Sequence, residues 1–325
     1  MKAASKETGF TLLELLVAVA ITLLLAGVIL SVTIGTLSIW RRTQDNFTSG
    51  TAAKLALDLI ERDLQSALYR KGGLNYTWLA ADVMNAPAAL LNHGWLAAPL
   101  MKPATSESQR LVPDPVNGQI PRITAARFGL SGVWLRLIAA TAESGSELAL
   151  PRVIAYQIAR RPVSGTITAA NPADIRYTLY RTAGSNQVTF TTGYDVAAGY
   201  GAAIANPGTG TDALATNVVD FGVWLYVRDS AGALRRIYPT DNGDLAHVAT
   251  DAIAPGDPHR FPEVVDVMVR VLTEEGARLL DAMEKSNGAI TRPANYASDA
   301  EWWWAVVEAN SRVLVRRVEL KGGAL

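Results

Sequence analysis

The 325-residue sequence contains no cysteine and only three histidines, His93, His247 and His259. Without cysteine the chain can form no disulfide, no thiolate metal site and no cysteine nucleophile. The histidines are far apart and lack the HxxxH and HExxH spacings, so we expect ordinary loop histidines. These absences do not exclude an extracytoplasmic location, because large exported domains can fold without disulfides.

The sequence also lacks a net charge and the common catalytic motifs. Its 30 basic and 30 acidic side chains give no global field that would attract nucleic acid, so we expect no nucleic-acid partner. There is no GxSxG, GxxxxGK[ST] or HExxH motif, and "GLSG" from Gly129 to Gly132 lacks the nucleophile-elbow spacing. The sequence therefore predicts a protein that is not an enzyme and uses no cofactor.

A long apolar run is present near the N-terminus. No Asp, Glu, Lys or Arg occurs from Leu15 to Trp40. A helix needs roughly 20 apolar residues to cross the hydrocarbon core, whereas a cleaved secretory signal has an apolar run of only about 7 to 15. The run therefore predicts a transmembrane helix, assigned to residues 10–40.

The segment "GFTLLELLVA", from Gly9 to Ala18, resembles the N-terminus of type IV pilins and of type II secretion pseudopilins. The resemblance implies that residues 1–9 are a leader, which prepilin peptidase removes between Gly9 and Phe10. It implies that the new amine of Phe10 is methylated and that Glu14 is the fifth residue of the mature chain. It also implies a single-pass inner-membrane protein with its body in the periplasm. This orientation rests on the resemblance, since the charged residues that flank the apolar run do not decide it.

Glu14 is unusual because it stands in an otherwise membrane-buried stretch. A charge near the bilayer centre costs about 2.5 to 3.5 kcal/mol on insertion scales. In the resembling family, the acid of one subunit neutralises the N-terminal amine of its neighbour, which sets the register of a filament. Buried ion pairs are best attested in such register roles. The alternative is an ordinary signal anchor that tolerates one acid near its cytoplasmic end.

The helix is predicted to continue as an amphipathic segment over residues 41–71. Its apolar residues recur at spacings of four, three, four and three, which places them on one helical face: Ala53, Leu57, Ile60, Leu64 and Ala67. Gly72-Gly73 would end this helix. The stretch "LIERDLQSAL" within it resembles the J-type minor pseudopilin of type II secretion.

Residues 72–325 are predicted to form a β-rich body, which gives an α+β fold: a long helix packed on an antiparallel sheet. Strands are expected where branched and aromatic residues gather between turn residues, at 133–138, 153–159, 176–181, 218–228 and 264–272. In the strand 218–228, one face should be core and the other wetter. Long loops are expected at 73–123, 195–216 and 284–300, with short helical turns at 78–84 and 86–91. The order and residues of these strands also resemble the J-type pseudopilin.

The C-terminal stretch "WWWAVVEANSRVLVRRVEL" is predicted to form two strands that turn at Ala309 to Ser311. The alternation of apolar residues slips at Arg316-Arg317, where a β-bulge would explain it. At least one residue of the tryptophan run 302–304 should be core, and packing of all three is favoured over an exposed binding patch.

Two further groups of polar residues are weak candidates for sites. Asp241 and Asp244 in "TDNGD" could donate oxygens to Ca²⁺, but the twelve-residue loop with its bidentate Glu is missing, so a polar Asn-Gly turn is the favoured explanation. Arg312, Arg316 and Arg317 suggest either a docking face or a solvated strand edge.

The sequence as a whole favours a minor pseudopilin of type II secretion, which would work with prepilin peptidase and other pilins or pseudopilins. A minor type IV pilin used in adhesion, twitching or DNA uptake is the second hypothesis. A monomeric, signal-anchored periplasmic binding domain is the third.

Overall fold

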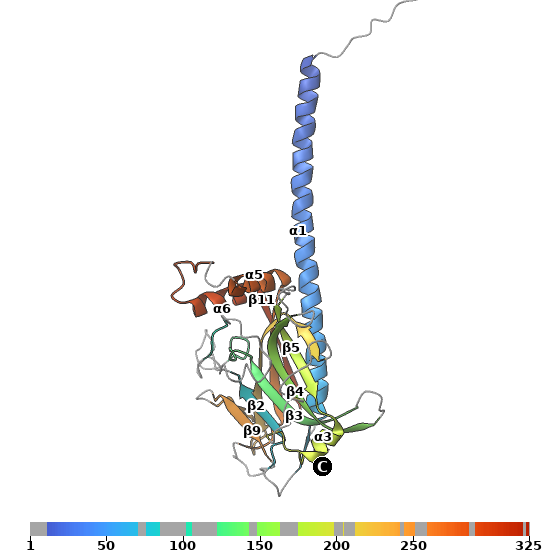
Figure 1. Ribbon diagram of the computed structural model, residues 1–325, viewed down its shortest axis with the longest axis vertical. Helices are drawn as coiled ribbons and strands as arrows, with labels where there is room; N and C mark the ends of the chain where they lie inside the picture. Colours follow the sequence, from blue (N-terminus) through green and yellow to red (C-terminus); the bar gives the residue numbers. More distant parts are fainter. Residues whose placement is uncertain are drawn as a thin grey trace, which may run out of the picture. The chain divides into compact units, whose positions relative to one another are not determined.

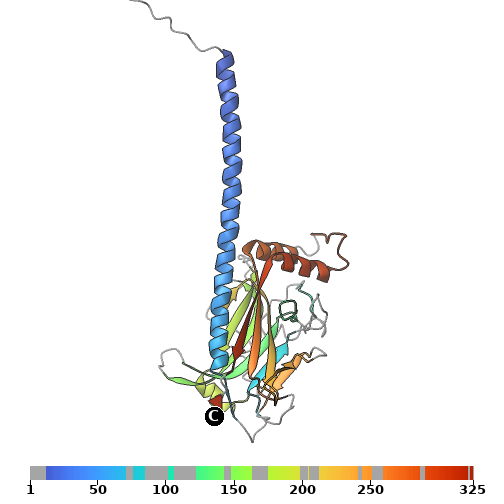
Figure 2. The same ribbon diagram turned by 180° about the vertical axis from the view of Figure 1, so that it is seen from behind.

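The computed structural model describes residues 12–70, 76–84, 102–105, 122–142, 148–162, 175–197, 204, 212–240, 244–250, 259–285, 290–320 and 323–324. The chain divides into two compact units, Met1–Phe47 and Thr48–Leu325. A long N-terminal helix, α1 (Leu12–Gln65), is followed by a body of antiparallel sheets, as Figures 1 and 2 show. The fold is α+β and pilin-like, which confirms the predicted fold class.

The second half of α1 belongs to the body and buries the predicted apolar face. Its five residues are at most 3% exposed: Ala53, Leu57, Ile60, Leu64 and Ala67. The helix ends earlier than predicted, at Gln65, and not near Gly72-Gly73. The amide of Ala67 bonds to the carbonyl of Leu64, and Ala67 then forms a bridge with Ala139, so pairing with strands ends the helix.

The body contains two larger sheets and one short strand pair. The first sheet has the order β6-β5-β4-β3-β2-β9 and the second β11-β10-β7-β8, with every adjacent pair antiparallel. The strands of the first sheet are β2 (Leu79–Val83), β3 (Val133–Ala142), β4 (Ala149–Pro162), β5 (Ile175–Ala183), β6 (Ala213–Thr216) and β9 (Ala246–Ala249). The strands of the second are β7 (Val218–Arg228), β8 (Leu234–Tyr238), β10 (Val264–Leu272) and β11 (Ser311–Glu319). The short pair consists of parallel strands β1 (Leu68–Tyr69) and β12 (Gly323–Ala324). All five predicted strands are confirmed.

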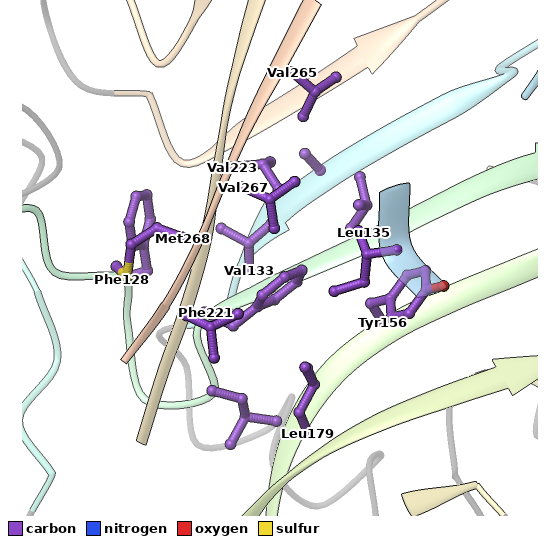
Figure 3. Close-up of a cluster of buried hydrophobic side chains, with 14 of the residues drawn as sticks. Phe128, Val133, Leu135, Tyr156, Leu179, Phe221, Val223, Val265, Val267 and Met268 are labelled. Atoms are coloured by element: carbon purple, nitrogen blue, oxygen red, sulfur yellow. The ribbon is translucent and has the colours of Figure 1, made fainter. Parts of the chain in front are cut away.

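The core lies between the two larger sheets (Figure 3). Phe221, Val223, Val265 and Val267 come from the second sheet, and Leu135, Tyr156 and Leu179 come from the first; all seven are fully buried. The rings of Tyr156 and Phe221 lie 6.5 Å apart. Apolar side chains from both sheets therefore form one continuous cluster.

The prediction of a wetter face on β7 is wrong over most of the strand. Asp220 is fully buried and Trp224 is 3% exposed, because other segments cover this face. Phe128 is one such cover, and its ring occupies the space that a side chain at position 222 would need. Gly222 therefore permits this close approach.

The tryptophan run lies in a helix, so the prediction of a strand there is wrong. Helix α6 (Asp299–Ala309) follows helix α5 (Glu274–Lys285), and both stand between β10 and β11. The hydroxyl oxygen of Ser298 accepts a bond from the amide of Glu301, whose carboxylate accepts one from the amide of Ala297. The S-x-x-E spacing of a capping box signals this helix start in the sequence. The three tryptophans are at most 8% exposed, which confirms that they are packing residues.

Strand β11 pairs with β10 in an unbroken register from Ser311 to Glu319, so the predicted bulge at Arg316-Arg317 is absent. Both faces of β11 hold half-buried or exposed residues. Because neither face is uniformly buried, the strand does not require strict alternation of apolar residues.

Two other local predictions are also corrected. Residues 79–83 form strand β2 in place of a helical turn, since this short run is buried on both faces and periodicity cannot identify it. The predicted turn at 86–91 lies outside the described residues. His247 is a buried strand residue of β9 and not a loop histidine, whereas His93 is not described. The three predicted loops are interrupted by β2, β6 and the ends of α5 and α6.

Candidate assembly site on the N-terminal helix

The N-terminal half of α1 exposes almost every apolar side chain. Residues Leu15–Leu37 form a 23-residue stretch of mean hydropathy 2.9, none of which is buried by the described chain. Among the side chains that the structure describes, the large apolar ones between Leu12 and Trp40 are 48% to 81% exposed. A helix of this length spans about 35 Å, enough to cross a hydrocarbon core of about 30 Å. This half of the helix is long and apolar enough to serve as a membrane anchor.

The three threonine hydroxyls within this apolar stretch have partners inside the helix. Thr22 donates to the carbonyl of Ala18 at 2.8 Å. Thr33 donates to Ile29 at 2.8 Å, and Thr36 donates to Val32 at 2.9 Å. An unpaired hydroxyl is costly in hydrocarbon, and bonding to the carbonyl four residues back removes that cost. These three threonines are therefore compatible with an apolar solvent.

The predicted processing residues fall largely outside the described part of the chain. Gly9 and Phe10 precede the first described residue. Glu14 belongs to α1, but its side chain is not described. The cleavage, methylation and register roles of these residues therefore stay predictions.

A buried acid connects the second half of α1 to the body, and sequence reasoning missed its role. Asp63 is fully buried and accepts a 2.7 Å bond from Nε of Arg181 and a bond from the hydroxyl of Tyr156. Figure 3 shows the oxygen of Tyr156 beside the ribbon of α1. We call Asp63, Tyr156 and Arg181 the Asp63 anchor. It links the helix to β4 and β5.

Two members of the Asp63 anchor, Tyr156 and Arg181, have shifted pKa values. Burial, and then the charge of Asp63, raise the pKa of Tyr156 well above its usual value, so its proton remains available for the bond. Burial lowers the pKa of Arg181, but the hydrogen bonds and charges of Asp63 and Tyr156 together outweigh this effect and raise it. The sequence carries a signal for this anchor: Asp63 lies three residues after Ile60, on the apolar face of the helix.

A second contact ties the same part of α1 to β11. Arg316 donates to Asp58 at 2.8 Å and also pairs with Glu61. Arg317 forms a two-bond pair with Asp266, at 2.7 and 2.8 Å. Two of the three arginines considered as a docking face therefore make contacts within the body. Asp58 and Arg317 are more than half exposed and Arg316 is partly exposed, so these pairs contribute modestly to stability.

The candidate Ca²⁺ residues are only partly described. One carboxylate oxygen of Asp244 accepts a bond from the amide of Thr240 at 3.1 Å, which is typical of a polar turn. Asp241 lies outside the described residues. Among the residues that the structure describes, no group of three or more histidines and acids could hold a metal ion. Ca²⁺ binding therefore stays a prediction without structural support.

Comparison with known proteins identifies the N-terminal segment. Residues 4–30 match the family model described as the prokaryotic N-terminal methylation motif. This match includes Gly9, Phe10 and Glu14 and extends into the apolar half of α1. No curated protein and no solved structure matches the chain.

The motif and the apolar helix together support a type IV pilin-like protein with a single membrane anchor. The motif implies processing by a prepilin peptidase and assembly with other pilins.

Proposed function

We propose that this protein is a minor pilin-like subunit of a periplasmic pseudopilus that serves type II protein secretion, placed at or near its tip. The observation that carries the proposal is the methylation motif at residues 4–30, joined to the apolar helical stretch Leu15–Leu37, none of which is buried among the described residues. Such a surface needs a membrane or apolar neighbours to cover it. The protein would act by assembly, without catalysis and without a cofactor.

The proposed assembly step depends on cleavage after Gly9. Removal of residues 1–9 creates the amine of Phe10, and this amine would pair with Glu14 of a neighbouring subunit. Two unpaired charges inside an apolar helix bundle are costly, so each subunit would favour the axial position that brings them together. The pair would therefore set the register of the filament.

The choice of a secretion pseudopilin over a pilus subunit rests on resemblance. "LIERDLQSAL" in α1 and the sequences of strands β4, β5, β7 and β10 resemble the J-type minor pseudopilin. A minor type IV pilin remains the alternative assignment. Deletion of the gene distinguishes the two: loss of protein secretion with normal surface pili supports the pseudopilin, and loss of pilus-dependent motility or DNA uptake supports the pilin.

Replacement of Glu14 by alanine tests the register role. Glu14→Ala should insert into the membrane and be cleaved after Gly9, but it should fail to co-purify with filaments. Leu16→Ala, which removes a nearby apolar side chain and no charge, is the matched control and should assemble. Mass spectrometry of the N-terminal peptide and filament pull-down measure the two steps. Normal incorporation of Glu14→Ala would contradict the register role, and an uncleaved wild-type chain in the presence of prepilin peptidase would contradict the pilin-like function itself.

A further inference from the structure

A lysine and an aspartate lie together in the interior of the body. Nζ of Lys102 is 3.5 Å from Oδ1 of Asp220, and neither side chain is exposed to solvent. Lys102 belongs to the described segment 102–105, whereas Asp220 is in the inner strand β7. Lysine is almost never fully buried, so this pair requires an explanation beyond ordinary surface charge pairing.

Neighbouring groups fix both partners in place. Nζ of Lys102 donates to the carbonyl oxygen of Val219 at 2.6 Å. The carboxylate of Asp220 accepts the amide of Phe128 at Oδ2 and the amide of Phe221 at Oδ1, each at 3.2 Å. The hydroxyl of Thr105 accepts the amide of Gly129 at 2.7 Å, which holds the lysine segment against the same loop. The nitrogen is therefore positioned beside a carboxyl group whose oxygens already face hydrogen-bond donors.

Burial shifts both members of the pair toward their uncharged forms. Burial lowers the pKa of Lys102 and raises the pKa of Asp220, although the attraction between the two opposes both changes. The positive charge of Arg270 lowers both pKa values. This favours the neutral amine of Lys102 and the charged carboxylate of Asp220. Transfer of one proton from Nζ to the carboxylate gives an amine and a carboxylic acid, and it removes two charges that are costly to bury.

We propose that Lys102 and Asp220 condense to form an intramolecular amide bond between Nζ and Cγ. The lone pair of the neutral amine attacks Cγ of the protonated carboxyl group, and the amides of Phe128 and Phe221, with the nearby guanidinium of Arg270, stabilise the oxyanion. A proton passes from the nitrogen to the departing hydroxyl, which leaves as water while the C=O bond re-forms. The reaction needs no oxidant, no reductant and no other co-reactant.

The amide bond would supply the covalent constraint that a chain without cysteine otherwise lacks. It would close a loop from residue 102 to residue 220 and join the insertion before β3 to an inner strand of the second sheet. Cross-links stabilise mainly by restricting the unfolded chain, with a larger effect for longer loops. The product is also neutral, so the interior no longer contains this ion pair.

The mass of the intact protein tests the proposal. The full-length chain, purified in detergent and then denatured, should be lighter than its sequence by the mass of one water molecule. Lys102→Arg keeps the positive charge but cannot form this amide, so it should show its full sequence mass. Lys54→Arg changes an exposed lysine of α1 and should keep the deficit. Chains with the same N-terminus are compared, so that leader cleavage does not affect the result.

Proteolytic mapping of the wild-type protein provides a second measurement that does not depend on the folding of a variant. The peptide that carries Lys102 should be recovered covalently joined to the peptide that carries Asp220. A wild-type chain of full mass would overturn the proposal. A mass deficit that persists in Lys102→Arg, or recovery of the two peptides only as separate species, would overturn it as well.

Discussion

Both halves of α1 are helical, but their side chains suit different surroundings. From Leu15 to Leu37 the helix has no charged residue, and none of this stretch is buried by the described chain. From Ala53 to Leu64 apolar residues occupy one face and are buried, while charged residues such as Lys54 and Asp58 face solvent. The first pattern suits a helix surrounded by apolar material, and the second suits a helix on the surface of a folded body.

An acidic residue has a different role in each half of the helix. Asp63 is buried, and Arg181 and Tyr156 of the same chain both donate to its Oδ2. Glu14 stands in the apolar half, which has no charged residue from Leu15 to Trp40 that could pair with it. The acid of the body therefore fixes a fold, whereas the acid of the membrane half is expected to select a partner subunit.

A large effect is expected from breaking the Asp63 anchor. Asp63→Ala leaves Arg181 and Tyr156 without their shared acceptor in the interior, which should lower the free energy of unfolding by about 3 kcal/mol. Urea unfolding of the chain in detergent, followed by tryptophan fluorescence, measures the change. Asp58→Ala is the control, because Asp58 is mostly exposed and its pair with Arg316 should contribute less than about 1 kcal/mol. Equal effects for the two variants would refute a special role for Asp63.

Truncation of leucines on opposite faces of the second half of α1 should have unequal effects. Leu64 is fully buried, so Leu64→Ala should cost about 2 to 5 kcal/mol through lost burial and a cavity. Leu55 is 63% exposed, and Leu55→Ala should change stability by less than about 0.5 kcal/mol. The same urea titration compares them. Similar losses would mean that the exposed face is covered in the protein in solution.

A charge placed in the first half of α1 should impair membrane insertion and leave the fold of the body intact. Leu24 is 71% exposed in the apolar stretch, so Leu24→Arg should cost about 2.5 to 3.5 kcal/mol on insertion. Carbonate extraction of membranes measures the fraction inserted, and Leu24→Ile is the matched control. If Leu24→Arg remained fully membrane-embedded, this part of the helix would not lie at the depth that we infer.

The body should lose stability in mild acid because of His247. Burial, and to a lesser extent the charge of His259, lower the pKa of His247 from 6.5 to about 4. Between these values the unfolded chain binds more protons than the folded one, so stability falls as the pH is lowered. The contribution of this residue should reach about 2 kcal/mol between pH 7 and pH 5. His247→Gln should remove that part of the pH dependence in urea titrations, and an unchanged pH profile would contradict the assignment.

The sequence predicts helices and strands correctly where the buried apolar residues recur with a single helical or strand spacing. The apolar face at residues 53–67 and the five predicted strands each carry a clear pattern, and the structure confirms that this face is buried and that the strands form. The prediction fails at β2 and α6, because both are buried on more than one side. Three consecutive tryptophans cannot distinguish a strand from a helix, whereas the capping box before them does so. Tertiary packing also explains the wrong prediction for β7, because segments distant in sequence cover the face that was expected to be wetter.

The residues of the candidate site also differ in how far the sequence alone can indicate them. Gly9, Phe10 and Glu14 belong to a contiguous motif, so the sequence alone can indicate them, and the match at residues 4–30 includes all three. Asp63 and Lys102 were not recognised as functional residues. Their partners Arg181 and Asp220 are 118 residues away in each case, so only the fold brings them together. A contiguous pattern can be read from one sequence, but a contact of this separation cannot.

The insertion of α5 and α6 between two neighbouring strands has a consequence for folding. Strands β10 and β11 are adjacent in the sheet, yet residues 273–310 separate them, so no tight turn brings them together. Loop closure over such a distance is slower than hairpin formation. Until β11 arrives, one edge of β10 stays open, and "VVDVMVRVL" is completely buried in the finished protein. We therefore expect β10 to be prone to aggregation during folding, in the interval before β11 pairs with it and completes the second sheet.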